Sequence, residues 1–148
     1  MAHPSSNLVD LARRIVEQEA GGTPDPAAAA AALETVCQWL TDHLVDLLGS
    51  GGVSAWLRRG LHLAQREQAL LADVSVSDEP DACFSGLAES FSASTGEEAT
   101  AAAATILAHM LDVLIMLLGE DLGMKPIRKN WPQATHLGAT ERDPGEMK

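Results

Sequence analysis

Two long segments, residues 27–48 and 97–118, constrain the fold of this chain most. Each repeats apolar residues at the period of an α-helix, and each runs into the same Leu-Leu-Gly sequence at its end. Asp25 before a proline has the form of a helix N-cap for the first segment. Thr95 and Glu98 have the form of a capping box for the second. The sequence therefore predicts two long amphipathic helices.

Three shorter helices are expected besides the two long ones. They cover residues 6–20, 53–72 and 81–92, with a loop at 74–80 and one further helical turn at 127–131. The glycine-rich stretch at 49–52 is predicted to be a loop between two helices. The expected buried stripe of the first long helix is Leu33, Val36, Cys37, Leu40, Leu44, Leu47 and Leu48.

Composition supports an all-α chain. Ala and Leu dominate, aromatic residues make up 3% of the chain, tyrosine is absent, and strand candidates are nearly missing. We therefore predict a compact bundle of about five helices, forming a single domain over residues 1–132. Residues 133–148 lack apolar periodicity and are expected to be a flexible polar tail.

A weak internal repeat links the two halves of the chain. A shift of 70 places lays residues 27–61 over 97–131 without a gap, and ten of the 35 pairs are identical. Asp42 matches Asp112 in this alignment. The pattern indicates a tandem duplication of a helix-hairpin unit, with repeat units at 5–61 and 81–131. The alternative is that two amphipathic Ala/Leu helices ending in glycine look alike without a common origin.

Charge and cysteine content limit the classes of partner and the cellular compartment that we expect for this protein. The chain contains ten Lys and Arg and 21 Asp and Glu, which gives a formal net charge of −11. This charge disfavours nucleic acid and anionic membrane partners. Cys37 and Cys83 fit no metal spacing and are expected to be reduced thiols. No apolar signal segment opens the chain, and the apolar stretch 105–118 is too short and too interrupted for a membrane span. We expect a cytoplasmic protein.

A polar stripe crosses the second long helix. Thr105, His109 and Asp112 occupy positions i, i+4 and i+7 and so share one helix face. Asp42, with His43 beside it, lies on the equivalent stripe of the first long helix. One interpretation is a small site between the helices that uses the His and Asp side chains as ligands or proton-transfer groups. The alternative is a solvent-facing strip, or a histidine that is hydrogen-bonded within the core. No EXXH or HEXXH motif is present, and we expect no metal or cofactor.

The sequence Ala-His-Met-Leu-Asp around His109, with Gly119 ten residues after the histidine, resembles histidine phosphotransfer domains. These are helical bundles with an exposed histidine in an Ala-His-x-Leu-Lys-Gly context. The resemblance implies that His109 would be phosphorylated. It departs from the family pattern because Asp112 replaces the lysine and Val113 replaces the glycine. An aspartate beside the histidine would repel a phosphoryl group.

Two tryptophans lie next to basic residues near the ends of the repeat units. Trp56 is close to Arg58, and Trp131 is close to Arg128. Tryptophan beside arginine is common in protein contact surfaces, although packing of both rings in the core is the simpler explanation. We predict a non-enzymatic regulatory or protein–protein interaction module that forms homodimers. The alternative is a ligand-, metal- or phosphoryl-binding signalling domain that uses the polar stripe.

Overall fold

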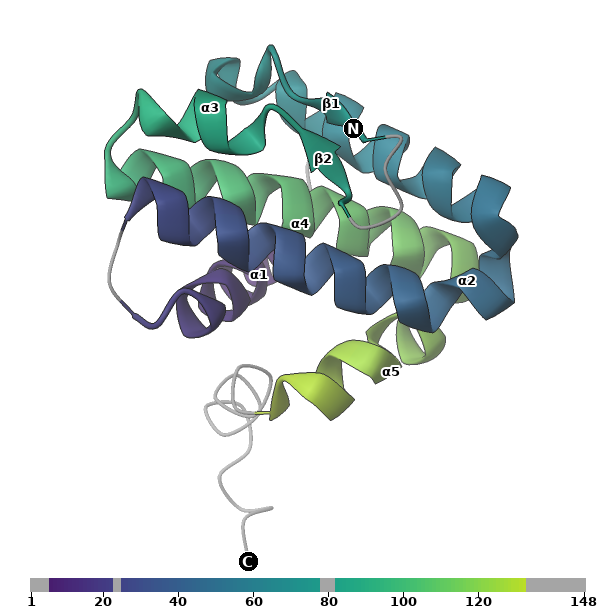
Figure 1. Cartoon of the computed structure of the whole chain (residues 1–148). Helices are drawn as coiled ribbons and strands as arrows, with labels where there is room; N and C mark the ends of the chain where they lie inside the picture. Colours follow the sequence, from purple (N-terminus) through teal and green to yellow (C-terminus); the bar gives the residue numbers. More distant parts are fainter. Residues whose placement is uncertain (1–5, 23–24, 78–81, 133–148) are drawn as a thin grey trace, which may run out of the picture.

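A central helix, α4 (Gly96–Leu118), organises the computed structural model in Figure 1. The structure describes residues 6–22, 25–77 and 82–132. The other helices are α1 (Ser6–Glu19), α2 (Pro26–Gln65), α3 (Leu87–Ser92), α5 (Glu120–Asn130) and the short 3-10 helix η1 (Ala69–Leu71). The strands are β1 (Ser75–Val76) and β2 (Phe84–Ser85). The prediction of an all-α bundle of about five helices is confirmed. The predicted tail, residues 133–148, lies outside the described residues.

Helix α4 is buried on nearly all sides. Every residue from Ala102 to Leu111 is buried, and α4 packs against α1, α2 and α5. By length and apolar composition α4 alone among the described helices could cross a membrane, but 67% of its most apolar 18-residue stretch is buried in the bundle. A helix that is apolar all round is typical of a protein core.

The predicted start signals of both long helices are confirmed. The carboxylate of Asp25 accepts a hydrogen bond from the amide of Ala28 at 2.9 Å, with proline at the first helical position of α2. Thr95 and Glu98 form the full capping box of α4, because each side chain accepts a hydrogen bond from the other residue's amide. These side chains satisfy amides that the first helical turn leaves unpaired.

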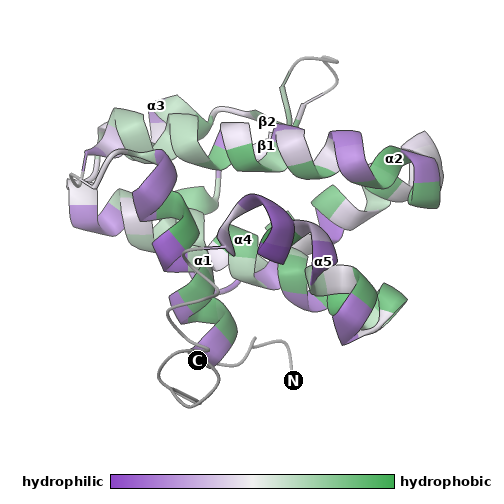
Figure 2. Cartoon of the chain, turned by 90° about the horizontal axis from the view of Figure 1, so that it is seen from below, coloured by the Kyte–Doolittle hydropathy of each residue, from purple (hydrophilic) through white to green (hydrophobic). Residues whose placement is uncertain are grey.

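Helix α2 is bent at one residue into two arms. Gly49 has a non-helical, left-handed backbone (φ 74°, ψ 164°) and separates a first arm, residues 26–48, from a second arm, residues 50–65. Figure 2 shows hydrophilic and hydrophobic residues alternating along α2, as expected of an amphipathic helix. The predicted loop at 49–52 is therefore wrong: only Gly49 leaves the helix, and the second arm resumes at once.

Gly119 repeats the backbone of Gly49 at the end of α4. Its φ of 87° and ψ of 160° lie close to the values at Gly49, and α5 begins at the next residue. Only glycine adopts this backbone region readily, because it has no Cβ. The two glycines are paired by the predicted repeat, and their common geometry agrees with it, although the duplication itself stays a prediction. The single turn predicted at 127–131 is in fact the longer helix α5.

Both arms of α2 contact α4 at Met110. Trp56 of the second arm donates its Nε1 hydrogen to the carbonyl of Met110 at 2.8 Å. Gly60, one turn later, packs so closely that an added Cβ would lie 2.6 Å from the Met110 Cγ. From the first arm, the Cys37 Sγ lies 3.7 Å from the Met110 Sδ. These contacts at Met110 fix how the two arms of α2 are positioned along α4.

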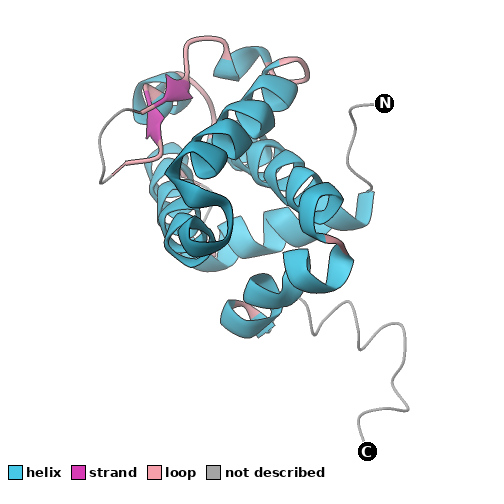
Figure 3. Ribbon diagram, turned by 90° about the vertical axis from the view of Figure 1, so that its right-hand side faces the viewer, coloured by secondary structure: helices cyan, strands magenta, loops and turns pink. Residues whose placement is uncertain are grey.

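The segment between α2 and α4 differs from the prediction. The helix expected over 53–72 ends at Gln65, whose amide donates to the carbonyls of Leu71 and Val74 at 2.9 and 2.8 Å and so turns the chain. The helix expected over 81–92 is shortened to α3, because β2 pairs with β1 in an antiparallel hairpin at the edge of the bundle (Figure 3). The expected loop at 74–80 thus contains one of the strands.

An aromatic cluster holds α1 and the end of α5 on the first arm of α2. The Trp39 ring meets the Trp131 ring edge-on, with centroids 4.9 Å apart, and lies 3.9 Å from the His43 ring. Trp131 is 1% exposed and donates its Nε1 hydrogen to Glu19, at the end of α1, at 2.9 Å. The cluster therefore joins α1, α2 and α5.

Candidate functional site

The polar stripe of α4 faces the segment that follows α2. Thr105 and His109 are buried, whereas Asp112 is half-buried. The Thr105 hydroxyl donates to the carbonyl of Ala101 at 2.8 Å and accepts from the amide of Gln68 at 3.3 Å. The turn after Gln65 thus lays polar side chains along this face of the core helix.

His109 is paired with Glu67 in the same place. The His109 Nε2 lies 2.7 Å from the Glu67 Oε2, and the histidine is 0% exposed while the glutamate side chain is 27% exposed. The ring Nδ1 is buried without a hydrogen-bond partner among the described residues. Because a carboxylate oxygen accepts, the His109 Nε2 carries a hydrogen and donates it to Glu67.

This arrangement limits what His109 can do chemically. Its Nε2 is held by a carboxylate, and its Nδ1 faces the interior, so neither nitrogen is presented to a substrate. A phosphorylatable histidine has to be exposed to its donor, and His109 is not. The geometry favours the alternative that His109 is hydrogen-bonded within the core and fastens the segment after α2 onto α4.

Asp42 and His43 do not join this site. Both are exposed on the first arm of α2, and no hydrogen bond links either of them to His109 or Asp112 in the part of the chain that the structure describes. His43 instead stacks on Trp39, with its Nδ1 3.2 Å from the Trp39 carbonyl. Thr105 and His109 therefore lie in the core, whereas Asp42 and His43 are separate surface residues. Among the described residues, no group of three or more His, Cys, Asp or Glu is arranged to hold a metal ion.

The tryptophans expected at a partner contact are buried. Trp56 is 2% exposed and bonded to α4, and Trp131 lies inside the aromatic cluster. Their rings pack within the chain, as the core interpretation predicts. Arg58 and Arg128 are exposed and remain the accessible part of this expected contact.

Large exposed apolar side chains gather where the long helices end. Among the described residues they are Val45 (37% exposed), Leu47 (63%), Met116 (75%), Leu117 (59%) and Leu122 (53%). We call these five residues the apolar end. They flank Gly49 and Gly119, and both bends lie at the right-hand end of the molecule in Figure 1. The predicted burial of Leu47 is wrong: Leu47 is 63% exposed, because it lies two residues before the bend at Gly49, where the first arm extends past the core.

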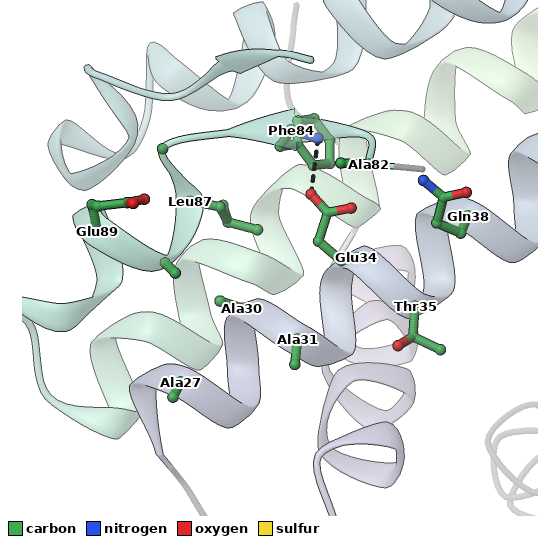
Figure 4. A pocket seen from close by; sticks show the side chains of 12 residues that line it. Ala27, Ala30, Ala31, Glu34, Thr35, Gln38, Ala82, Phe84, Leu87 and Glu89 are labelled. Atoms are coloured by element: carbon green, nitrogen blue, oxygen red, sulfur yellow. Dashed lines mark hydrogen bonds between the residues drawn. The ribbon is translucent and has the colours of Figure 1, made fainter. Parts of the chain in front are cut away.

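A groove of about 680 Å³ lies between the first arm of α2 and the β2–α3 segment (Figure 4). Glu34 stands at its floor and points towards β2, where its two carboxylate oxygens accept from the amides of Cys83 and Phe84 at 2.9 and 2.8 Å. Both oxygens are therefore occupied by the backbone. Gln38, Ala82 and Leu87 are among the side chains that line the groove.

Cys37 and Cys83 come together next to residues that line this groove. Both are buried free thiols. The Cys83 Sγ lies 3.7 Å from the Gln38 Nε2 and 3.7 Å from the Thr41 Oγ1. A hydrogen bond with the Cys37 thiol, aided by one with Thr41, lowers the pKa of Cys83, whereas burial raises the pKa of Cys37 well above its ordinary value. Residues 46 positions apart gave no sequence signal for this pairing.

Comparison with known proteins assigns no family. The chain matches no protein-family model, no curated protein and no solved structure.

Proposed function

We propose that this chain is a non-enzymatic protein-interaction module that forms a homodimer through its apolar end. One observation carries the proposal: all the large, exposed apolar side chains of the described residues belong to this one feature of the fold. Monomeric proteins scatter such side chains singly, whereas gathered ones mark association surfaces.

The apolar end suits a second copy of the same chain. Leu47 and Leu117 occupy matching positions in the predicted repeat, each two residues before a glycine bend. A twofold dimer uses the same surface on both subunits, so that surface has to be complementary to itself. A surface with two similar halves meets this requirement, because one half can face the other half of the second copy.

Charge sets how this association should respond to salt. The chain carries a formal net charge of −11, and Asp46, Glu120 and Asp121 lie exposed beside the apolar end. Two copies repel each other over long range, and salt screens that repulsion. Homodimerisation should therefore become tighter as salt rises, whereas a complex with a basic protein partner would become weaker.

The oligomeric state of the full chain tests the proposal. Size-exclusion chromatography with light scattering should give twice the chain mass at high concentration. Leu47→Glu and Leu117→Glu should each give the monomer mass with unchanged circular dichroism. Ala55→Glu is the matched control, because Ala55 is exposed on the second arm of α2 and lies outside the apolar end. It should remain dimeric.

Two results would overturn the proposal. A wild-type monomer at the highest attainable concentration, with or without added salt, would exclude the homodimer. A dimer that survives both glutamate substitutions would show that the apolar end is not the contact surface.

A further inference from the structure

The thiols of Cys37 and Cys83 are held against each other by neighbouring contacts. Thr41 lies one helical turn after Cys37 on the same face of α2, and Gln38 directly follows Cys37. The Cys83 sulfur lies 3.7 Å from a polar atom of each of these two residues. These two contacts place it beside the turn of α2 that carries Cys37, close enough for each thiol to perturb the pKa of the other.

The backbone around Cys83 is fixed as well. Glu34, three residues before Cys37 on α2, accepts hydrogen bonds from the amides of Cys83 and Phe84 (Figure 4). This carboxylate fastens the start of β2 to the same helix face that carries Cys37. Two thiols on separate, mutually anchored segments are preorganised to react with each other.

The two thiols differ in a way that assigns them different tasks. Hydrogen bonds from the Cys37 thiol and the Thr41 hydroxyl lower the pKa of Cys83, so its thiolate forms first. Burial raises the pKa of Cys37, which stays protonated and donates to the Met110 sulfur at 3.7 Å. The thiolate is the nucleophile in thiol chemistry, so Cys83 attacks an oxidant before Cys37 does.

Access to Cys83 selects small oxidants. Cys83 is 3% exposed, but Gln38, whose amide touches its sulfur, lines the open groove. We therefore expect a small oxidant, such as hydrogen peroxide, to reach the sulfur in the folded protein past the Gln38 side chain, and an aromatic thiol reagent to be excluded.

We infer that Cys37 and Cys83 form a peroxide-reactive dithiol, in which Cys83 is the attacking thiol, Cys37 is the resolving thiol, and the product is an intramolecular disulfide. The Cys83 thiolate attacks one peroxide oxygen, the O–O bond breaks, and the departing hydroxide takes up a proton to leave as water. The Cys37 sulfur then attacks the Cys83 sulfenic acid, and the Cys37 proton leaves with the hydroxyl group as a second water. Two electrons pass from the sulfurs to peroxide, and a dithiol reductant reverses the change.

Oxidation of the purified full chain tests this inference. Hydrogen peroxide should remove both free thiols and lower the intact mass by about 2 Da, the two hydrogens of a disulfide. Proteolysis should then yield a linked peptide pair containing Cys37 and Cys83, and dithiothreitol should separate it. An aromatic disulfide reagent should leave both thiols of the folded protein unreacted and react with both in urea.

Single variants test the assigned roles. Cys37→Ala should accumulate a sulfenic acid at Cys83, which adds about 16 Da to the intact mass and which dimedone traps once the oxidised protein is unfolded in urea, whereas Cys83→Ala should leave Cys37 reduced. Thr41→Val keeps both thiols and nearly the same side-chain shape but lacks the hydroxyl at the Cys83 sulfur, so its disulfide should form several-fold more slowly at neutral pH. Circular dichroism establishes that each variant is folded.

The inference fails if peroxide leaves both thiols of the folded wild type intact, or adds oxygen to them without a link. It also fails if dimedone labels Cys37 in Cys83→Ala instead of Cys83 in Cys37→Ala. An unchanged rate in Thr41→Val would remove the role of the hydroxyl in activating Cys83.

Discussion

Replacing Gly60 with alanine tests the closest contact in the core. The new Cβ would lie 2.6 Å from the Met110 Cγ and 3.3 Å from the Met110 Cα, whereas carbon atoms pack well at about 3.5–4.0 Å. The backbone contact cannot be relieved by a side-chain rotation. Overpacking of this kind costs about 1–3 kcal/mol, and alanine returns about 1 kcal/mol through its higher helix propensity. Taking the upper half of the range, we expect the free energy of unfolding to fall by about 1–2 kcal/mol.

Gly51→Ala is the matched control on the same helix. Gly51 also lies in the second arm of α2, but a Cβ there meets no atom within 4 Å, and its φ is not positive. The propensity gain is then unopposed, so the free energy of unfolding should rise by about 0.5–1 kcal/mol. The same substitution should therefore have opposite signs at two positions nine residues apart.

Urea unfolding followed by circular dichroism measures both changes. Parallel transitions with shifted midpoints would report stability alone. A Gly60→Ala variant as stable as the wild type would show that the second arm does not cross α4 this closely at Met110. A destabilised Gly51→Ala variant would show that Gly51 is not in a regular helix.

Three further predictions concern the caps, the buried pair and the dithiol. Thr95→Ala removes the hydroxyl that caps α4 and should cost about 1 kcal/mol in urea unfolding, and an unchanged midpoint would contradict the capping box. Glu67→Ala leaves the His109 Nε2 hydrogen buried without its acceptor and should cost about 1–3 kcal/mol. In a double-mutant cycle with His109→Leu most of that cost should vanish, and additive losses would contradict the pairing. Because the pKa of Cys83 is lowered, its thiolate persists to lower pH than that of a free cysteine. The rate of thiol loss to peroxide should therefore increase with pH, and this increase should begin at a lower pH than for a free cysteine. In Cys37→Ala the increase should begin at a higher pH than in the wild type.

Local signals were sufficient for most of the secondary structure. The caps at Asp25 and Thr95 and the buried stripe from Leu33 to Leu44 depend on residues within one or two helical turns, so the sequence predicts them correctly. The glycine-rich bend was harder. Propensity alone predicts a loop, but packing of Val53 and the residues after it against the core keeps all except Gly49 helical.

The candidate sites depend on contacts that local patterns do not contain. His109 was correctly placed on a polar stripe, but its partner, Glu67, lies 42 residues earlier and follows a turn that Gln65 makes with distant carbonyls. Cys83 lies beside the turn of α2 that carries Cys37 because Glu34 accepts hydrogen bonds from the amides of Cys83 and Phe84. Strand β2, paired with β1, replaces a predicted stretch of helix there. Helix periodicity shows which residues share a face, but not which segment covers that face.

The aromatic cluster supplies an intrinsic optical reporter. The chain has three tryptophans and no tyrosine, so its ultraviolet emission comes from Trp39, Trp56 and Trp131. Two of these indoles touch each other where α5 and α1 are fastened to the first arm of α2, while the third is bonded to α4 at the centre of the bundle. Detachment of α5 alone would therefore expose Trp39 and Trp131 to water and leave the surroundings of Trp56 unchanged. A red shift of the emission in two steps would then distinguish detachment of α5 from unfolding of the core.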